Sequence, residues 1–186
     1  MDEPTVRVLL LRGVNVGGHR RVPMAELRQL LTEAGHRHVR TLLQSGNAVL
    51  VTPPGPTDEV AAAVAASLAD RFGFPVQTLV LETATLRGIV ARCPFPAEQL
   101  DPTGVHVALL DRPAREHPLA DADPARFAPD EFRLGEREIY ARYPNGSGRS
   151  RLAQALAAPL PDGVATARNW RTVTRLLELA EATPAE

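Results

Sequence analysis

Glycine, asparagine, serine and arginine crowd into one short stretch, "YPNGSGRSRL", at residues 143–152. A helical pattern follows it directly, and the free backbone amides at the start of a helix favour an anion. Arg149 adds a planar guanidinium that suits phosphate or carboxylate. Ser147 or Ser150 can instead cap the helix, because a capping oxygen takes the place of an anion. Both roles stay open, and the two extra glycines together with Arg149 favour a ligand.

The glycine-rich stretch "RGVNVGGHRR" at residues 12–21 is a second candidate. Glycine lets a ligand approach the backbone, so the amides of Gly17 and Gly18 are candidate donors to phosphate oxygens. The stretch is no P-loop, because His19 and Arg20 stand where that motif needs a lysine and a hydroxyl residue. A surface turn explains the same composition equally well.

Two further stretches carry dense polar residues. "QSGN" at residues 44–47 suits a tight hairpin turn. "TARNWRTVT" at residues 166–174 surrounds the only tryptophan with arginines and an asparagine. Arginine beside an aromatic ring can hold a nucleotide or single-stranded nucleic acid. Asn169 also suits a helix cap, and Trp170 also suits a core position.

The charges are unevenly distributed along the 186 residues, although the net charge is only −1. Residues 1–51 hold seven arginines and four acidic residues, and residues 140–176 hold six arginines and one acidic residue. An acidic middle segment separates them. If the basic segments meet in space, they form a patch for anionic ligands.

The composition describes an ordinary globular chain, with 44% hydrophobic and 23% charged residues. The single cysteine, Cys93, excludes an internal disulfide. A basic signal segment and a long apolar run are both missing, which predicts a cytoplasmic protein without membrane contact. "GHRH" at residues 35–38 lacks the partners of a metal site, so we predict neither a metal nor a cofactor.

Hydrophobic periodicity predicts the elements that position these motifs. The first half has the order strand, helix, strand, strand, helix, strand, with Thr57 or Asp58 near the cap of its second helix. The predicted limits are 5–12, 23–35, 38–44, 47–52, 56–73 and 75–81.

The second half repeats much of this order after a helix at 83–93. It holds four strands, an irregular stretch at 112–130, a helix at 148–160 and a final helix at 169–182. We predict an α/β (α+β) fold of two tandem ferredoxin-like βαββαβ lobes with antiparallel or mixed sheets, formed by internal duplication. The lobes span 1–94 and 95–186 and pack together as one unit.

The four polar motifs, taken together, resemble DUF1697, a bacterial family of unknown function. They occur in the order and spacing of that family, and the resemblance runs from about residue 6 to 181. It implies an α/β protein of two similar lobes, and it supplies no activity. Arg151 stands where the family usually has lysine, and Arg171 stands where asparagine is common. The motif residues are Arg12, Gly13, Asn15, Gly17, Gly18, Gln44, Ser45, Gly46, Asn47, Asn145, Gly146, Ser147, Gly148, Arg149, Ser150, Arg168, Asn169 and Trp170.

Four recurring motifs are harder to explain as four independent turns than as one site. We therefore predict a binding protein for a phosphate-bearing or anionic ligand, either a nucleotide or single-stranded nucleic acid. The low aromatic content, 4%, favours a small ligand over a long strand. The predicted ligand-binding residues are Arg12, Asn15, Gly17, Gly18, Gln44, Ser45, Asn47, Asn145, Gly146, Ser147, Arg149, Ser150, Arg168, Asn169 and Trp170.

Two alternatives compete with this prediction. A metal-independent transferase or hydrolase acting on a small polar substrate would use Ser147 or Ser150 with His19 and the same amides. The sequence shows no nucleophile–base pair for it, and it assigns no catalytic residue. The motifs could instead be structural, with asparagine and glutamine side chains satisfying buried backbone groups at the lobe interface.

Overall fold

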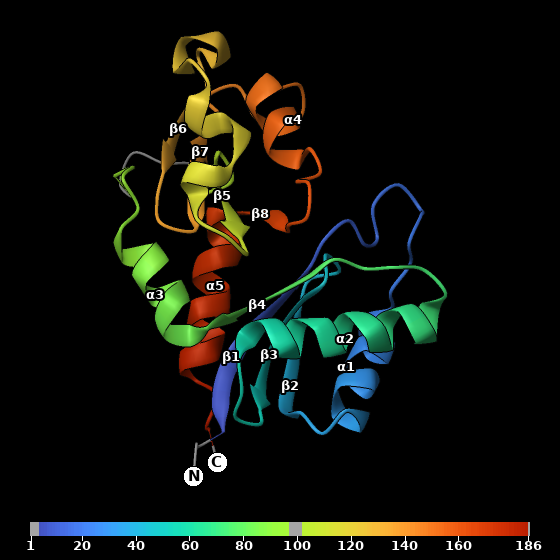
Figure 1. The fold of residues 1–186 in the computed structure, drawn as a ribbon. Coiled ribbons are helices and arrows are strands. Elements are labelled where there is room, and N and C mark those ends of the chain that lie inside the picture. Colours follow the sequence, from blue (N-terminus) through green and yellow to red (C-terminus); the bar gives the residue numbers. More distant parts are fainter. Residues whose placement is uncertain (1–3, 97–101, 186) are drawn as a thin grey trace. The chain divides into compact units, whose positions relative to one another are not determined.

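The computed structural model describes residues 4–96 and 102–185. The chain divides into two compact units, which we name the N-terminal unit (residues 1–86 and 175–186) and the C-terminal unit (residues 87–174). The division falls inside two helices, α3 (Thr83–Ala91) and α5 (Trp170–Glu181). Each unit contains a four-stranded antiparallel sheet and its own hydrophobic cluster. The helices and strands are labelled in Figure 1.

The N-terminal unit has the predicted ferredoxin-like order. Its sheet runs β2-β3-β1-β4, and every neighbouring pair is antiparallel. Both crossovers place their helices, α1 and α2, on the same face of the sheet (Figure 1). The elements are β1 (Thr5–Leu11), α1 (Met24–Glu33), β2 (Arg37–Leu42), β3 (Asn47–Thr52), α2 (Thr57–Phe72) and β4 (Thr78–Glu82).

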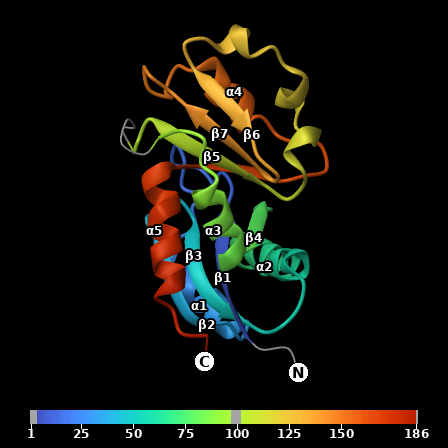
Figure 2. The same ribbon diagram turned by 90° about the vertical axis from the view of Figure 1, so that its left-hand side faces the viewer.

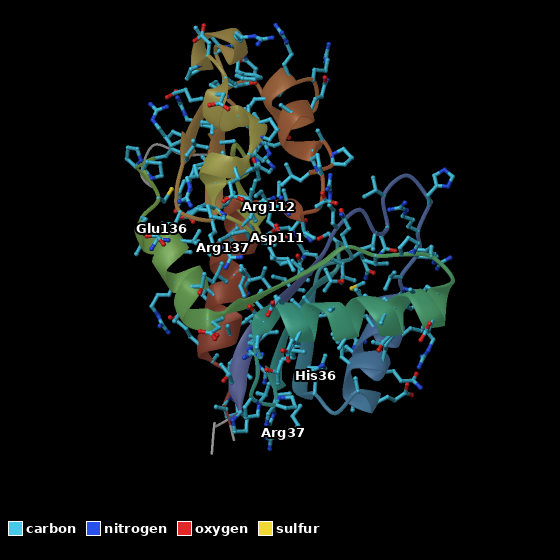
Figure 3. All side chains as sticks on the ribbon, viewed as in Figure 1. His36, Arg37, Asp111, Arg112, Glu136 and Arg137 are labelled. Atoms are coloured by element: carbon cyan, nitrogen blue, oxygen red, sulfur yellow. The ribbon has the colours of Figure 1, made fainter. Side chains whose placement is uncertain are left out.

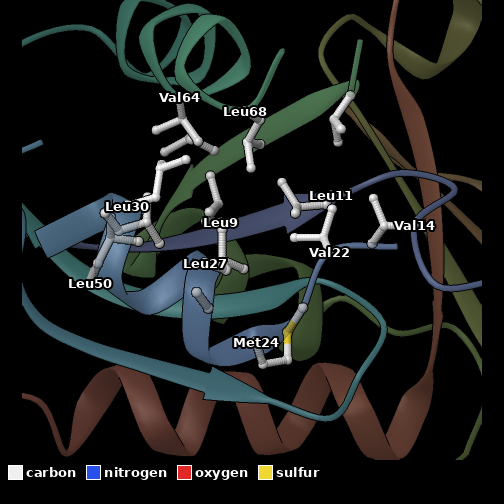
Figure 4. Packing of buried hydrophobic residues seen from close by; sticks show 14 residues of the cluster. Leu9, Leu11, Val14, Val22, Met24, Leu27, Leu30, Leu50, Val64 and Leu68 are labelled. Carbon is white, nitrogen blue, oxygen red and sulfur yellow. The ribbon is translucent and has the colours of Figure 1, made fainter. Parts of the chain in front are cut away.

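The alternation of side chains along β1 explains which face is covered by helices. Leu9 and Leu11 point to the face that carries α1 and α2, where they join a buried cluster with Leu27, Leu31 and Leu68. Figure 4 shows part of this cluster between the sheet and the helices. Burying one such leucine contributes about 1.5–3 kcal/mol, so the cluster accounts for much of the stability of the unit.

The two ends of α2 follow different rules. Gly73 ends the helix in the left-handed conformation, with φ 75°, as a glycine at this position commonly does. At the other end the N-cap is Pro56, and no side chain caps the helix there. Thr57 and Asp58 therefore lie near the cap, as predicted, and neither of them supplies it. Both residues lie within the first turn, where the negative charge of Asp58 suits the helix dipole.

The C-terminal unit repeats the strand order of the first. Its sheet runs β6-β7-β5-β8 with antiparallel neighbours throughout, which confirms two tandem ferredoxin-like lobes. Figure 2 shows this sheet in the turned view. The elements are β5 (Val105–Leu110), β6 (Glu131–Leu134), β7 (Glu138–Arg142), α4 (Arg151–Ala157) and β8 (Ala165–Asn169).

The first crossover of the C-terminal unit is irregular, as predicted for residues 112–130, so this lobe lacks the first helix of the βαββαβ order. Three short 3-10 helices take the place of an α-helix: η2 (Ala114–Glu116), η3 (Pro118–Asp121) and η4 (Pro124–Phe127). Prolines recur in this segment, and a proline inside an α-helix removes a backbone donor and clashes with the preceding turn. The segment therefore folds into single turns that lead directly into β6.

Candidate functional site

The first two motifs meet at one end of the N-terminal sheet, where β1 ends and the β2–β3 hairpin turns. Asn15 joins them. Its Nδ2 donates to the carbonyl oxygens of Val22 (2.9 Å) and Gln44 (2.6 Å), and its Oδ1 accepts from the amide of Val22 (2.9 Å). Its φ of 57° lies in the left-handed region, which asparagine tolerates well. The side chain of Asn15 thus fastens one loop to the other.

The hairpin residues also have structural roles, in hydrogen bonds and close packing within the N-terminal unit. Asn47 is fully buried, and its Nδ2 donates to the carbonyl of Leu42 and to the hydroxyl of Ser45, each at 2.9 Å. Gly46 has φ 74°, and a Cβ built there would lie 2.7 Å from the Cβ of Leu11. This turn therefore requires glycine both for its conformation and for the close approach of β1. Gln44 is exposed, and only its backbone carbonyl is used by Asn15.

The remaining residues of the first motif lie at the same end of the sheet. Arg12 donates from Nη1 to Oε1 of Gln77 at 3.0 Å, and burial lowers its pKa. Gly17 and Gly18 are exposed and have φ values of 60° and 79°. A Cβ at either glycine would meet nothing within 4 Å, so the space around this backbone is open to a ligand.

The third motif forms the connection between β7 and α4. Gly146 turns the chain with φ 79°, and its amide donates to the carbonyl of Tyr143 at 3.1 Å. Ser150 is buried and caps α4, because its Oγ accepts from the amide of Ala153 at 2.9 Å. The same hydroxyl donates to Oδ2 of Asp130 at 2.6 Å. The capping role predicted for this position is confirmed, and it falls to Ser150.

A cavity of about 240 Å³ opens beside this connection. Its wall combines the segment before β6 with the segment before α4, because β6 and β7 are neighbours in the sheet. The lining residues are Arg126, Phe127, Ala128, Pro129, Asp130, Asn145, Gly146, Arg149, Ser150 and Arg151.

The wall of the cavity is positively charged. It carries three arginines, Arg126, Arg149 and Arg151, against one carboxylate, Asp130. Among the residues that the structure describes, the guanidinium groups of these three arginines have no hydrogen-bond or ion-pair partner. Asp130 already accepts the hydrogen bond of Ser150. An anion in the cavity would therefore meet unpaired donors.

The fourth motif lies at the same end of the C-terminal sheet, where β8 ends. Asn169 caps α5, since its Oδ1 accepts from the amide (2.9 Å) and the hydroxyl (2.7 Å) of Thr172. Arg168 donates from Nη1 to the hydroxyl of Thr166 at 2.7 Å, and burial lowers its pKa to about 10, so it stays charged at neutral pH. Trp170 is half-buried at the first position of α5.

The opposite end of the C-terminal sheet is also rich in charge, but its labelled side chains form ion pairs or hydrogen bonds to backbone carbonyls. Arg112 contacts Asp111 at 3.2 Å, and Arg137 donates to the carbonyl of Asp111. Figure 3 labels these residues together with Glu136, which lies 3.8 Å from Arg92. Within the described part of the chain, Arg112 and Arg137 therefore differ from the three arginines of the cavity wall, whose guanidinium groups have no partner.

The structure thus joins the first motif to the second within the N-terminal unit, and it places the third and fourth motifs at one end of the C-terminal sheet. Four predicted residues line the cavity: Asn145, Gly146, Arg149 and Ser150. The predicted ligand-binding residues did not include Arg151, Arg126 or Asp130. The signal for Arg126 and Asp130 was the predicted hairpin, since the segment before its first strand must lie beside the segment after its second strand.

Residues 4–96 and 102–185 lack two other kinds of feature. No group of three or more histidine, cysteine, aspartate or glutamate side chains there could hold a metal ion. No helix in this part of the chain has the length and apolar character needed to cross a membrane.

A solved structure shares this fold. The conserved bacterial protein SP0830 from Streptococcus pneumoniae superimposes with a TM-score of 0.74, at 20% sequence identity. The superposition covers 95% of this chain and 99% of that protein. At this identity the likeness establishes the fold alone. A comparison with curated proteins found no match.

A family model matches the sequence as well. The model describes a protein of unknown function (DUF1697) and matches residues 5–140, about three quarters of the chain. The match contains the first two motifs and ends shortly before the third, so the resemblance of the last two motifs rests on their residues. The chain belongs to the DUF1697 family.

Proposed function

We propose that this protein binds a phosphate-bearing or otherwise anionic ligand in the cavity of the C-terminal unit. One observation carries the proposal: three arginines, Arg126, Arg149 and Arg151, line the cavity, and their guanidinium groups are unpaired among the described residues. Arginine is well suited to phosphate, because its planar donors match two phosphate oxygens at once. An anion would also relieve the mutual repulsion of three like charges.

The volume of the cavity limits the size of the group that it can hold. A volume of about 240 Å³ lies below the range of about 300–1,000 Å³ that is usual for whole small-molecule ligands. The cavity would therefore hold a phosphate group, while the rest of a nucleotide or the chain of a nucleic acid stays outside. Trp170 lies at the same end of the sheet and is half-buried, and we propose that it stacks on a base.

The proposal also includes the exposed tip of the first motif, at Gly17 and Gly18 in the N-terminal unit. The backbone at Gly17 and Gly18 is open to solvent, and Arg20 and Arg21 follow it with exposed side chains. These residues would bind phosphate oxygens through amides and guanidinium groups. We propose no ligand contact for the side chains of Asn15 and Asn47, because internal hydrogen bonds account for both.

Binding fits the geometry better than catalysis does. The hydroxyl of Ser150 donates to Asp130 and accepts from Ala153, so its two roles are structural. A nucleophilic serine needs a base to take its proton and an open approach for the substrate. Ser150 is only 7% exposed, which closes that approach.

A thermal-shift screen tests the proposal. The panel holds nucleotides, sugar phosphates, pyrophosphate, polyphosphate, and short single-stranded RNA and DNA, each at two salt concentrations. A ligand at a hundred times its Kd adds about 2.7 kcal/mol, or roughly 5–10 °C in Tm for a chain of this size. A shift that persists at high salt and disappears in Arg149→Met supports the cavity. Equal shifts in Tm with every polyanion, all lost at high salt, would show only non-specific binding to a basic surface and would contradict the proposal.

A further inference from the structure

Arg7 occupies a position that the strand pattern reserves for apolar side chains. On β1 it lies two residues before Leu9 and four before Leu11, so it points to the face covered by α1 and α2. Its side chain is only 3% exposed. A buried guanidinium is costly unless an anion or several hydrogen-bond acceptors surround it.

The acceptors that surround Arg7 are too few. Its Nη2 donates to the carbonyl of Gly55, while Nε and Nη1 are buried without a partner in the part of the chain that the structure describes. His36, 8% exposed, and Thr52, fully buried, each hold an unpartnered polar atom, Nδ1 and Oγ1 respectively. Leu50 on β3 is the cross-strand partner of Arg7, and Thr52 lies two residues after Leu50. Thr52 and Arg7 therefore lie on the same face of the sheet.

The buried charge at this place is positive. Burial, and then the charge of Arg7, lower the pKa of His36, so the imidazole is neutral at pH 7 and Arg7 supplies the net charge. Two carboxylates lie nearby. Glu82 is the cross-strand partner of Arg7 on β4, and Glu59 lines the adjoining cavity, yet both are exposed and neither forms an ion pair with Arg7 in the structure.

That cavity has a volume of about 230 Å³ and borders the buried groups through His36 and Gly55, while Arg7 and Thr52 are not part of its wall. His36 forms part of its wall, as does Gly55, whose carbonyl receives the bond from Arg7. Figure 3 labels His36 at this place, near α2. The rest of the wall comes from Ala34, the proline-rich segment 53–56 and the side of α2.

We propose that this cavity is a second binding site, specific for a small oxyanion such as phosphate, sulfate or a carboxylate, held by Arg7 and His36. An oxyanion offers several acceptors on one small group. It would accept from Nε and Nη1 of Arg7, and from Nδ1 of His36 in the tautomer that carries its proton there. It would also neutralise the buried charge. The site lies within residues 7–67, so it is independent of the cavity at Arg149.

The test is calorimetric titration of the full chain with inorganic phosphate, sulfate and acetate, each against chloride at equal ionic strength. Arg7→Met keeps the length of the side chain and removes its charge. We expect phosphate binding to weaken at least about tenfold in Arg7→Met, because charged hydrogen bonds are lost. Arg40→Met removes an exposed arginine on β2 and should leave binding unchanged. Arg149→Met should also leave this site unchanged, which separates it from the function proposed above.

A second readout covers the case in which Arg7→Met does not fold. The histidine ring signals of the wild-type protein, with those of His36 identified from the variant His36→Gln, are followed by NMR during the phosphate titration. Movement of the His36 signals with the calorimetric Kd supports the site. Signals that stay fixed while phosphate reaches high concentration would overturn it. So would strong destabilisation in Glu82→Gln together with no response to any oxyanion, because Glu82 would then be the partner of Arg7.

Discussion

Ser150 Oγ lies 2.6 Å from Asp130 Oδ2, and the same oxygen accepts the amide of Ala153 at 2.9 Å. One hydroxyl thereby links the start of α4 to the segment before β6, twenty residues earlier in the chain. Burial and the charge of Asp130 raise the pKa of Tyr143, which begins the connection between β7 and α4. The wall of the C-terminal cavity is thus held by a few polar contacts around one carboxylate.

The substitution Ser150→Ala removes both bonds of this hydroxyl. Loss of an N-cap costs about 1 kcal/mol, and the lost bond to the Asp130 carboxylate raises the expected loss to about 2–3 kcal/mol. The free energy of unfolding, measured by urea denaturation, checks this value. Ser147→Ala is the matched control, because Ser147 is half-buried in the same connection and has no side-chain bond among the described residues. Equal losses in the two variants would contradict the double role of Ser150.

Asn15→Ala tests whether the first motif is fastened by its asparagine. Three side-chain hydrogen bonds would be lost at once, and alanine is less favourable than asparagine at a φ of 57°. We expect a loss of about 2–4 kcal/mol in the free energy of unfolding. Gln44→Ala keeps the backbone carbonyl that Asn15 uses and should cost within about 0.5 kcal/mol. A loss after Gln44→Ala as large as that after Asn15→Ala would argue against this role for Asn15.

His117 predicts a dependence of stability on pH. It is 2% exposed, its Nδ1 accepts from the amide of Leu119, and burial lowers its pKa below the ordinary 6.5. The unfolded chain therefore binds more protons than the folded chain once the pH falls below about 6.5. The contribution of neutral, buried His117 to the free energy of unfolding is therefore fully present above that pH. It is lost as the pH falls through the lowered pKa of His117 in the folded state.

Urea denaturation at a series of pH values from about 8 to 5 measures this effect. His117→Gln should reduce the slope of stability against pH in the acidic part of that range, although His36 and His106, whose pKa values burial also lowers, keep part of it. His19→Gln replaces an exposed histidine and serves as the control. A slope that is the same in His117→Gln and the wild type would show that His117 is not the titrating group.

Much of the fold could be predicted because the hydrophobic periodicity and the residues that end helices and strands indicate the same elements along the chain. The predicted strand 47–52 is β3, and the predicted helix 56–73 is α2 within one residue at each end. The predicted strands 38–44 and 75–81 are displaced, since β2 ends at Leu42 and β4 begins at Thr78. Leu43 has a left-handed φ of 58°, which ends β2, and a leucine gives no warning of that conformation.

The sites were harder to predict because they depend on contacts between distant segments. Arg149 was found from its local composition, whereas Arg126 and Asp130 reach the same cavity only through the pairing of β6 with β7. Arg7 was missed because one arginine in a strand is ordinary on an exposed face. The sequence did indicate its burial, because Arg7 alternates with Leu9 and Leu11 along the strand and therefore lies on the same face, which α1 and α2 cover.

The most direct test of the central claim is calorimetric titration of the phosphate ligand that gives the largest thermal shift, with wild type, Arg149→Met and Arg115→Met. Arg115 is 81% exposed in the same unit, outside the cavity wall, and so provides the control. If the cavity binds the ligand, Arg149→Met should lose about 1.5–3 kcal/mol of binding free energy while Arg115→Met keeps the wild-type Kd. The same Kd in all three proteins would contradict the claim that the arginines around this cavity bind the anion.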